Sequence, residues 1–435
     1  MSATAGRLTI IEKCRISPPP NTVGEKSIPL TFFDMVWLLS HPVHQLFFYH
    51  FPHSKSHFIH EIIPKLKRSL SLTLQHFFPF ASNLTVFPTE NRLARNPEIR
   101  YVDGDSLVLT FAECDLDFHD LKRNHPRDCN KFHGLVPALE DPFKVSNLVK
   151  IPVFSIQVTI FENTGITIGL TNHHSLCDAR TRAIEYPDSL DKMWLNLPQI
   201  RTLDESYKAL ELVPQADRVR STFVLTRSQI NTLKKWVLVQ LPTLEYVSSF
   251  AIGCGYVWSC IAKSRVHVVG KKGEYDVERF ACVADWRSRL ATPVPQTYFG
   301  NCTGLCLAKT KTTLITGSKG FPTAVELVST AIREGVESKQ GVFEAETWLE
   351  KTFLKVPTVG VAGTPKLNVY DVDFGWGRPE KYETVSLDFN DSISVNASKE
   401  SWEDLEIGLC LPAKQMDAFI TISRKDLESM ISHRF

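Results

Sequence analysis

The sequence predicts a mixed α/β fold in two domains. Its 435 residues are more than one ordinary hydrophobic core organises, and 43% of them are hydrophobic, which is enough to fill two cores. Segments with strand and helix patterns follow one another irregularly, without the strict β-α-β order of a doubly wound parallel sheet. The chain turns polar and proline-punctuated after Tyr186. We therefore expect an N-terminal domain over residues 1–185, a connecting segment over 186–217 and a C-terminal domain over 218–435.

The N-terminal half contains one clear helix pattern and one clear hairpin pattern. Apolar residues recur at helical spacing over residues 58–74, which predicts a long amphipathic helix kinked near Pro64. Residues 151–161 and 165–170 are short, β-rich and separated by a polar turn, which predicts a β-hairpin. His174 therefore follows directly on the end of a strand.

The C-terminal half begins with a predicted helix. Ser248 and Ser249 precede an apolar run over residues 250–261, so that free N–H groups at this helix start could meet a phosphate or an amide of a ligand. Simple capping of the helix is the alternative. Further patterns predict a helix over residues 323–336, a strand over 405–411 and a closing helix over 413–422.

Composition excludes several classes of function. With 49 Lys and Arg against 48 Asp and Glu, the net charge of +1 gives no reason to expect nucleic acid or an anionic membrane as a partner. No apolar stretch approaches a membrane span and the N-terminus lacks the apolar core of a signal peptide, so we expect a cytoplasmic protein. The ten cysteines include no Cys-x-x-Cys pair, and the histidines between His41 and His60 lack His-Glu-x-x-His spacing. We predict no metal site.

The pair His174 and Asp178 is the first candidate for chemistry. An imidazole with an ordinary pKa near 6.5 can accept a hydroxyl proton at neutral pH, and the aspartate four residues later could fix the turn. Because the chain has 14 histidines, an ordinary hydrogen-bonded histidine is the alternative. The sequence contains no Gly-x-Ser-x-Gly run, which argues against a serine hydrolase that uses His174 in a triad.

Two further blocks make an accidental pattern less probable. In the run from Asp373 to Gly377, two glycines around Trp376 let the backbone turn tightly and present an indole N–H, although a structural turn would look the same. Residues 298–302 read Tyr-Phe-Gly-Asn-Cys and follow an arginine-containing block at 285–290.

With these blocks the sequence resembles the plant BAHD acyltransferase family, whose two signatures are a His-x-x-x-Asp run and an Asp-Phe-Gly-Trp-Gly run. Both are present intact and in order. Residues 298–302 resemble the extra signature of the clade that acylates anthocyanin, flavonoid and other phenolic glycosides, often from malonyl-CoA. The similarity extends over about residues 8–422 and includes the run Pro-Leu-Thr-Phe-Phe-Asp at 29–34.

The resemblance implies a two-domain CoA-dependent acyltransferase fold, with mixed β-sheets covered by helices and a channel between the domains. It implies acyl-CoA, with malonyl-CoA favoured over a hydroxycinnamoyl-CoA, as a co-substrate rather than a permanently bound cofactor. It also implies a glycosylated phenolic or flavonoid small molecule as the acceptor of a monomeric enzyme. His174 would take the proton of the acceptor hydroxyl while that hydroxyl attacks the thioester, without a covalent enzyme intermediate. Trp376 would donate its N–H to the oxyanion, with a packing role as the alternative.

The same resemblance suggests supporting roles. Asp178 would orient the loop through a salt bridge to an arginine of the 285–290 block, for which we expect Arg289. Asp373 could be an acid or a base, although its glycine-rich turn favours a scaffold role. Ser248, Ser249 and Asn301 are candidate contacts for acyl-CoA.

A malonyl group also requires a cation near the transfer site. We favour Arg182 over Arg180 as the clamp for its carboxylate, because malonyl-using relatives tend to carry an arginine there; a solvated surface arginine is the alternative. The chain departs from the family just beyond Arg182, since a helix and loop of roughly thirty residues that help to wall the pocket are missing before residues 185–191. A catalytically impaired homologue that binds a ligand or partner without turnover is therefore the second hypothesis.

Overall fold

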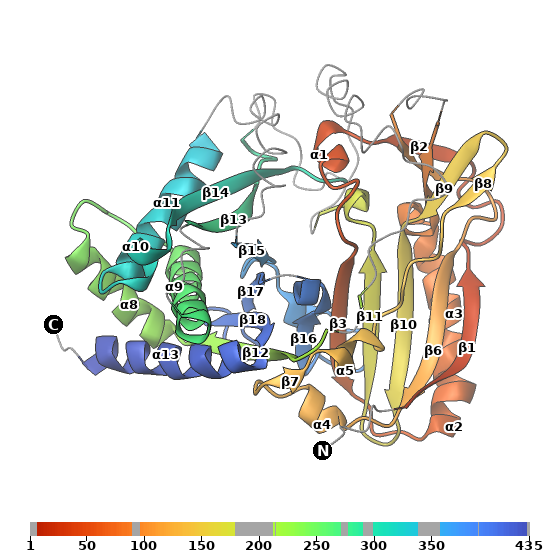
Figure 1. Cartoon of the computed structure of the whole chain (residues 1–435). Helices are drawn as coiled ribbons and strands as arrows, with labels where there is room; N and C mark the ends of the chain where they lie inside the picture. The colour runs from red at the N-terminus through yellow and green to blue at the C-terminus, as the bar shows by residue number, and fades with distance from the viewer. Residues whose placement is uncertain are drawn as a thin grey trace.

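The computed structural model describes residues 7–88, 96–178, 212–213, 215–270, 277–289, 299–337, 357–389 and 391–432. These residues form a mixed α/β fold with three sheets, as the sequence predicts (Figure 1). The predicted connecting segment falls almost wholly outside them, so the domain boundaries stay a prediction. No helix among the described residues is long and apolar enough to cross a membrane.

A six-stranded sheet carries the hairpin that leads to His174. Its strand order is β1 (Leu8–Ile16), β6 (Leu107–Cys114), β10 (Phe154–Phe161), β11 (Gly165–Asn172), β3 (Val43–His50) and β16 (Lys381–Thr384). Strands β10 and β11 pair antiparallel from Phe154 opposite Asn172 to Phe161 opposite Gly165, which confirms the predicted hairpin. Residues 151 and 152 belong instead to a separate strand, β9 (Leu148–Pro152).

The predicted long helix covers one face of this sheet, and its irregularity lies before Pro64. It begins as α2 (Lys55–His57), passes through a π-helical turn at Phe58–Ile62 and continues as α3 (Ile63–Leu74). Ile63 donates its N–H to the carbonyl oxygen of Phe58. Because proline lacks an N–H and crowds the preceding turn, the wider π turn accommodates it without ending the helix.

A small five-stranded sheet lies beside the first one. Its order is β2 (Lys26–Pro29), β5 (Glu98–Tyr101), β4 (Asn83–Val86), β9 and β8 (Phe143–Val145). The short helix α1 (Phe32–Met35) follows β2 and brings a turn of the N-terminal region towards His174, as its contacts with the 3-10 turn at His174–Leu176 show.

A seven-stranded sheet organises the C-terminal half. Its order is β14 (Thr303–Lys311), β13 (Val277–Asp285), β15 (Thr358–Ala362), β17 (Ile393–Ala397), β18 (Leu405–Pro412), β12 (Arg218–Leu225) and β7 (Arg127–Asp128). The helices that pack here are α8 (Arg227–Gln240), α9 (Ser249–Val269), α10 (Thr312–Thr316), α11 (Gly320–Glu337) and α13 (Ala413–Ser432). The three predicted helices are confirmed, and the last one extends ten residues beyond its predicted end, from residue 422 to 432.

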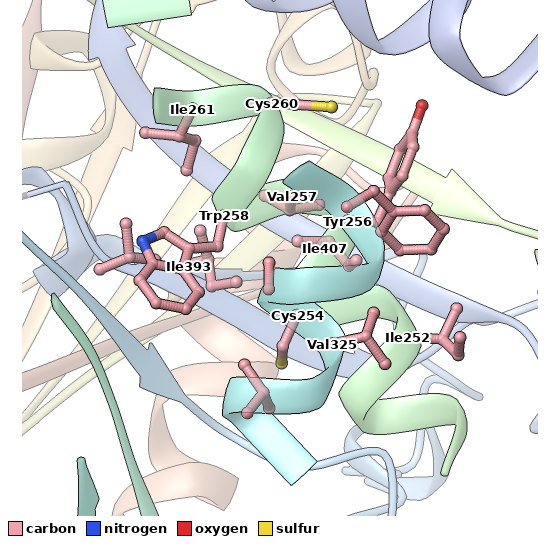
Figure 2. Close-up of a cluster of buried hydrophobic side chains, with 14 of the residues drawn as sticks. Ile252, Cys254, Tyr256, Val257, Trp258, Cys260, Ile261, Val325, Ile393 and Ile407 are labelled. Atoms are coloured by element: carbon pink, nitrogen blue, oxygen red, sulfur yellow. The ribbon is translucent and has the colours of Figure 1, made fainter. Parts of the chain in front are cut away.

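Helix α9 is the centre of this second core. Its residues from Ala251 to Ala262 are all buried, which is the pattern of a helix buried all round rather than of a surface helix. Figure 2 shows its side chains beside Ile393 and Ile407 of the sheet and beside Val325 of α11, all of them buried. Gly255 permits the close approach of α11, because a Cβ there would lie 2.8 Å from the backbone nitrogen of Val325.

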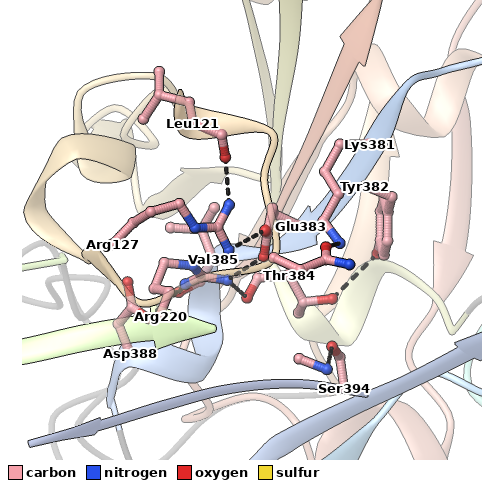
Figure 3. A network of polar contacts seen from close by, with 12 residues as sticks. Leu121, Arg127, Arg220, Lys381, Tyr382, Glu383, Thr384, Val385, Asp388 and Ser394 are labelled. Carbon is pink, nitrogen blue, oxygen red and sulfur yellow. Dashed lines mark hydrogen bonds and ion pairs between the residues drawn. The ribbon is translucent and has the colours of Figure 1, made fainter. Parts of the chain in front are cut away.

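Each large sheet contains one short strand from the other half of the chain, and buried ion pairs accompany these two strands. Strand β7 pairs with β12, and β16 pairs with β3. Between them, Arg127 and Arg220 both bind Glu383, at 3.0 and 3.2 Å, and Arg220 also binds Asp388 (Figure 3). Burial alone would raise the pKa of Glu383, but the two guanidinium groups outweigh it and hold that pKa at about 2. The network therefore ties the two large sheets together while leaving Glu383 ionised.

The remaining described elements are short. They are α4 (Phe118–Leu121), α5 (Asn130–His133) and the 3-10 turns Phe78–Ala81, His174–Leu176, Val369–Asp371 and Val385–Phe389.

Candidate active site

His174 lies in a 3-10 turn immediately after β11, where the turn is fixed by the preceding histidine. His173 is buried and donates its backbone N–H to the carbonyl oxygen of Val153 at 2.8 Å. Its Nδ1 accepts hydrogen bonds from the backbone N–H of Ser175, at 3.3 Å, and from the Ser175 hydroxyl, at 2.7 Å. His173 therefore caps the turn and points away from solvent, which leaves His174 as the histidine available for chemistry. Sequence analysis did not single out His173, although the adjacent pair of histidines was visible.

The imidazole of His174 is neutral and stacked. Burial lowers its pKa from 6.5 to about 4, and only a contact with its own backbone opposes this effect. Its Nδ1 is buried and makes no hydrogen bond to another described residue. The indole of Trp37 lies parallel to the ring, with centroids 4.0 Å apart and planes 7° apart. With Nδ1 buried, Nε2 is the nitrogen left to face a substrate.

Asp178 forms a buried ion pair, but with Arg287 rather than with the predicted Arg289. The two guanidinium nitrogens of Arg287 donate to the two carboxylate oxygens of Asp178 at 2.9 and 2.7 Å. Arg287 is 1% exposed and also donates to the carbonyl oxygen of Gly300 at 3.0 Å. The backbone N–H of Cys302 donates to Asp178 at 3.0 Å. Asp178 thus ties the histidine loop to the 299–302 segment.

The prediction of Arg289 was wrong because the arginines lie in a turn. The carboxylate of Asp285 accepts the backbone N–H of Arg287 at 3.1 Å, and this local bond directs the Arg287 side chain inward. Arg289 is exposed and donates to the carbonyl oxygen of Asp285. Helical or strand periodicity gives no indication of which side chain of such a turn is buried.

Asn301 is brought to His174, but it contacts the protein rather than facing a ligand. Its side-chain nitrogen donates to the backbone carbonyl of His174 at 3.1 Å and to Oδ1 of Asp34 at 3.0 Å. Its side chain is fully buried. The predicted contact of Asn301 with acyl-CoA is therefore replaced by support of the histidine backbone.

Asp34 is a residue that sequence analysis did not propose as a site residue. Its carboxylate accepts from the backbone N–H and hydroxyl of Thr31, at 2.9 and 2.7 Å, and from the backbone N–H of Asn301 at 2.7 Å. Burial raises its pKa to about 6, against these hydrogen bonds, which lower it. The local Thr-x-x-Asp spacing could have suggested the first two bonds, but the bond to Asn301 joins residues 267 positions apart.

The turn of Asp373 and Trp376 lies far from His174, which makes the predicted catalytic roles of both residues wrong. The indole of Trp376 packs on Tyr49 and Phe51, with ring centroids 6.0 and 5.8 Å away. Tyr49 pairs with Ile166 near the start of β11, whereas His174 follows the end of that strand. At about 3.3 Å per residue, the separation along the strand is on the order of 20 Å. Trp376 therefore cannot donate to an oxyanion formed at His174.

The scaffold role that the sequence favours for Asp373 is confirmed. One carboxylate oxygen of Asp373 accepts the backbone N–H groups of Gly375 and Gly377 at 2.7 and 3.0 Å. Both glycines have positive φ, 95° and 84°, which side chains rarely permit. The turn docks on β3 through the hydroxyl of Tyr49, which donates to the carbonyl oxygen of Val372 at 2.9 Å.

Of the remaining predicted residues, one caps a helix and others lie outside the described part of the chain. Ser248 caps α9, since its hydroxyl accepts the backbone N–H of Ala251 at 3.0 Å, and this confirms the capping alternative. Contact of Ser248 or Ser249 with acyl-CoA stays a prediction. Arg180 and Arg182 lie outside the described residues, as does Tyr298. The predicted channel also stays a prediction, because residues 179–211, which closely follow His174, lie outside the described residues.

One group of potential metal ligands lies apart from His174 in the described part of the chain. The ligand atoms of Cys129, Asp388 and Cys410 lie within 4.8 Å of one another, and all three residues are buried. Both oxygens of Asp388 are already engaged, one by Arg220 and the other by His133 at 2.8 Å. This group is a closed part of the ion-pair network, and the absence of a metal site stays a prediction.

Comparison with known proteins matches nearly the whole chain. A family model described as "Transferase family" matches residues 6–184 and 191–425. The malonyl-coenzyme A:anthocyanin 3-O-glucoside-6''-O-malonyltransferase of Dahlia pinnata is 50% identical over 98% of this chain and 98% of its own. Phenolic glucoside malonyltransferase 1 of Nicotiana tabacum is 38% identical over 89% and 91%. Coumaroyl-CoA:anthocyanidin 3-O-glucoside-6''-O-coumaroyltransferase 2 of Arabidopsis thaliana is 32% identical over 98% and 99%.

Solved structures share the fold at low sequence identity. Vinorine synthase superimposes with a TM-score of 0.67 at 19% identity, over 95% of this chain and 96% of its own. TRI101 of F. sporotrichioides, complexed with coenzyme A and T-2, gives a TM-score of 0.63 at 15% identity, over 91% and 97%. These likenesses show the fold alone.

The comparisons also bear on the shortening that the sequence suggests after Arg182. The family model matches in two blocks with a break at residues 185–190, where the shortening was expected. The alignment with the Dahlia relative spans 454 positions, more than the 435 residues of this chain, so part of the relative has no counterpart here.

Proposed function

Because this chain belongs to the plant BAHD acyltransferase family, we propose that it transfers a malonyl group from malonyl-CoA to a sugar hydroxyl of an anthocyanin or other phenolic glucoside. The Dahlia malonyltransferase supports this donor, because its identity with the chain exceeds that of the Arabidopsis coumaroyltransferase. The protein would act as a cytoplasmic monomer, with acyl-CoA as a co-substrate and no permanently bound cofactor.

The observation that carries the proposal is the neutral, stacked imidazole of His174 at the end of β11. Nε2 takes the proton of the acceptor hydroxyl as its oxygen attacks the thioester carbonyl. The C–S bond then breaks, the ester forms, and the CoA thiolate takes the proton from the imidazolium. Because burial lowers the pKa of His174, the imidazolium is costly, and the face of Trp37 is placed to stabilise it as it forms.

A malonyl carboxylate needs a cation, and Arg182 is our candidate for it, with Arg180 as the second choice. A bidentate guanidinium matches a carboxylate in shape and charge. Replacement of Arg182 by alanine should then raise the KM for malonyl-CoA while leaving the KM for acetyl-CoA near its wild-type value.

The direct test is turnover by the purified protein. Malonyl-CoA, p-coumaroyl-CoA and acetyl-CoA are each offered with a panel of anthocyanin, flavonoid and simple phenolic glucosides, and the ester product and released CoA are both measured. We expect a malonyl ester that disappears in His174→Ala. Absence of turnover with every donor, from a protein that unfolds cooperatively, would instead support the impaired homologue, and calorimetry with the same ligands would then measure whether it still binds them.

A further inference from the structure

We infer that Asp34 is a positioning residue for the general base, acting through Asn301, whose side-chain amide it orients towards the backbone carbonyl of His174. The inference rests on the proposed role of His174 as the base. Both side chains are buried among protein groups, so the effect of Asp34 on the reaction is indirect.

The first step of the argument is that four donors converge on one carboxylate. Oδ2 of Asp34 accepts the backbone N–H and the hydroxyl of Thr31, and Oδ1 accepts the backbone N–H and the side-chain amide of Asn301. A neutral asparagine at this position would place its own NH₂ group against one pair of these donors. The site therefore requires a carboxylate, and an ionised one can satisfy all four donors.

The second step concerns the orientation of the Asn301 amide. Its nitrogen donates both to Asp34 and to the carbonyl oxygen of His174, while its oxygen is buried and has no hydrogen-bond partner among the described residues. A flipped amide would point its oxygen at the carboxylate of Asp34 and at the His174 carbonyl, and both contacts would repel it. Asp34 thereby determines that Asn301 presents a donor to His174.

The third step is that Asp34 is connected to both sides of the histidine. It begins the turn that carries Trp37, whose backbone N–H donates to the carbonyl oxygen of Asp34 at 3.1 Å. Trp37 in turn stacks on the His174 ring. One residue thus supports the ring through Trp37 and the backbone through Asn301, which lies just before β14 of the other large sheet. The position of the base therefore depends on contact between the two halves of the molecule.

Stability of the fold alone does not account for a buried carboxylate at this position. Burial raises the pKa of Asp34, so ionisation there costs free energy of folding at neutral pH. Such a cost is typical of residues that are retained for function. Asp34→Asn removes this cost but leaves one pair of donors unpaired, so the expected result is a loss of kcat that exceeds any loss of folded protein.

The test compares Asp34→Asn, Asn301→Ala and the double variant with the wild type. We expect each single variant to lower kcat on the order of 10- to 100-fold through displacement of the base, with the KM for acyl-CoA changed less than about 3-fold. Since both residues act through one chain of contacts, the double variant should lose no more than the worse single variant. Multiplied losses, an unchanged kcat, or a change confined to KM would overturn the inference.

Asn130→Ala is the matched control. Asn130 also bridges two segments through its side-chain amide, to Asp128 and to residue Gln215, but it lies on α5 next to β7. Its loss should lower the melting temperature while leaving kcat unchanged. If kcat in the Asp34 and Asn301 variants falls only in proportion to the folded fraction, as a structural role would require, positioning is refuted.

A second readout does not depend on turnover. In protein labelled with ¹³C at histidine Cε1, the His174 resonance is assigned by its disappearance in His174→Ala. The resonance should move in Asp34→Asn and Asn301→Ala and stay in place in Asn130→Ala. An unmoved resonance in folded Asp34→Asn protein overturns the inference even if no acyl donor is ever turned over. If Asp34→Asn does not fold, Thr31→Val, which removes one donor to the same carboxylate, should shift the resonance by a smaller amount.

Discussion

Replacement of Arg287 by methionine should unfold the protein at a distinctly lower temperature. The substitution keeps most of the side-chain volume but removes both hydrogen bonds to the carboxylate of Asp178, the one to the carbonyl of Gly300 and the one to the carboxylate of Asp285. The pair is nearly enclosed, with 1% and 12% of the two side chains exposed. Loss of one partner of such a pair typically costs about 3–5 kcal/mol, because the other charge is left uncompensated.

The expected shift in melting temperature is on the order of 10 °C, since each kcal/mol corresponds to about 2–4 °C for a domain of roughly 200 residues. Thermal unfolding followed by circular dichroism measures it. The malonyl transfer rate should fall as well, because Asp178 ties the loop of His174 to the 299–302 segment through Cys302. The double variant Asp178→Asn, Arg287→Met should recover part of the stability, since it leaves no uncompensated charge at position 178, and Asp285, the other acidic partner of Arg287, is one-third exposed.

Arg289→Met is the matched control for this prediction. Arg289 stands in the same turn but is exposed, so its replacement should change the free energy of unfolding by less than about 0.5 kcal/mol. The assignment of the ion pair is wrong if Arg287→Met has the melting temperature of the wild type, or if Arg289→Met lowers the melting temperature more than Arg287→Met does.

Three further predictions follow from the same contacts. Trp37→Leu should lower kcat about 3- to 30-fold by removing the aromatic face that stabilises the imidazolium, and an unchanged kcat would refute this role. Because the pKa of His174 is lowered to about 4, kcat/KM should show no decline near pH 6.5 that is assignable to this residue, and an acidic limb at 6.5 would contradict the assignment. Burial opposes protonation of His133, but its bond to Asp388 raises its pKa from 6.5 to about 9. Protonated His133 thus contributes about 3 kcal/mol to the free energy of unfolding below pH 6.5, and this contribution is lost as the pH rises through 9. Denaturant titrations at several pH values should show the loss in the wild type and not in His133→Gln.

Local patterns were sufficient for the elements around the base. The alternation of β-rich segments about a polar turn predicted the hairpin that ends before His174. Apolar runs predicted the first residues of α9, α11 and α13 to within three positions, whereas α9 and α13 continue eight and ten residues beyond their predicted ends. These elements follow from periodicity and capping, which depend on neighbours a few positions away. The π turn before Pro64 was predicted only as a kink, because the way a helix accommodates proline depends on what packs against it.

The partners of the base could not be found in the same way. From the sequence we expected Arg289 rather than Arg287 as the partner of Asp178, and we grouped Trp376 with His174 because both stand in family signatures. Tertiary structure placed Trp376 at the opposite end of β11 and β3, and it brought Asp34 to Asn301 across 267 positions. Contacts at such separations depend on how whole sheets pack, which no local pattern encodes.

The sequence by itself determined the family of this protein, its mixed α/β fold and the histidine that we propose as the base, because family signatures and periodic patterns are visible in short runs of residues. Only the tertiary structure decided what surrounds that histidine: the indole of Trp37 on its ring, the amide of Asn301 on its carbonyl and the Arg287 pair beside its loop. The physical reason is burial, since it is the enclosure of these polar groups between two sheets that makes their hydrogen bonds obligatory and so fixes the base in place.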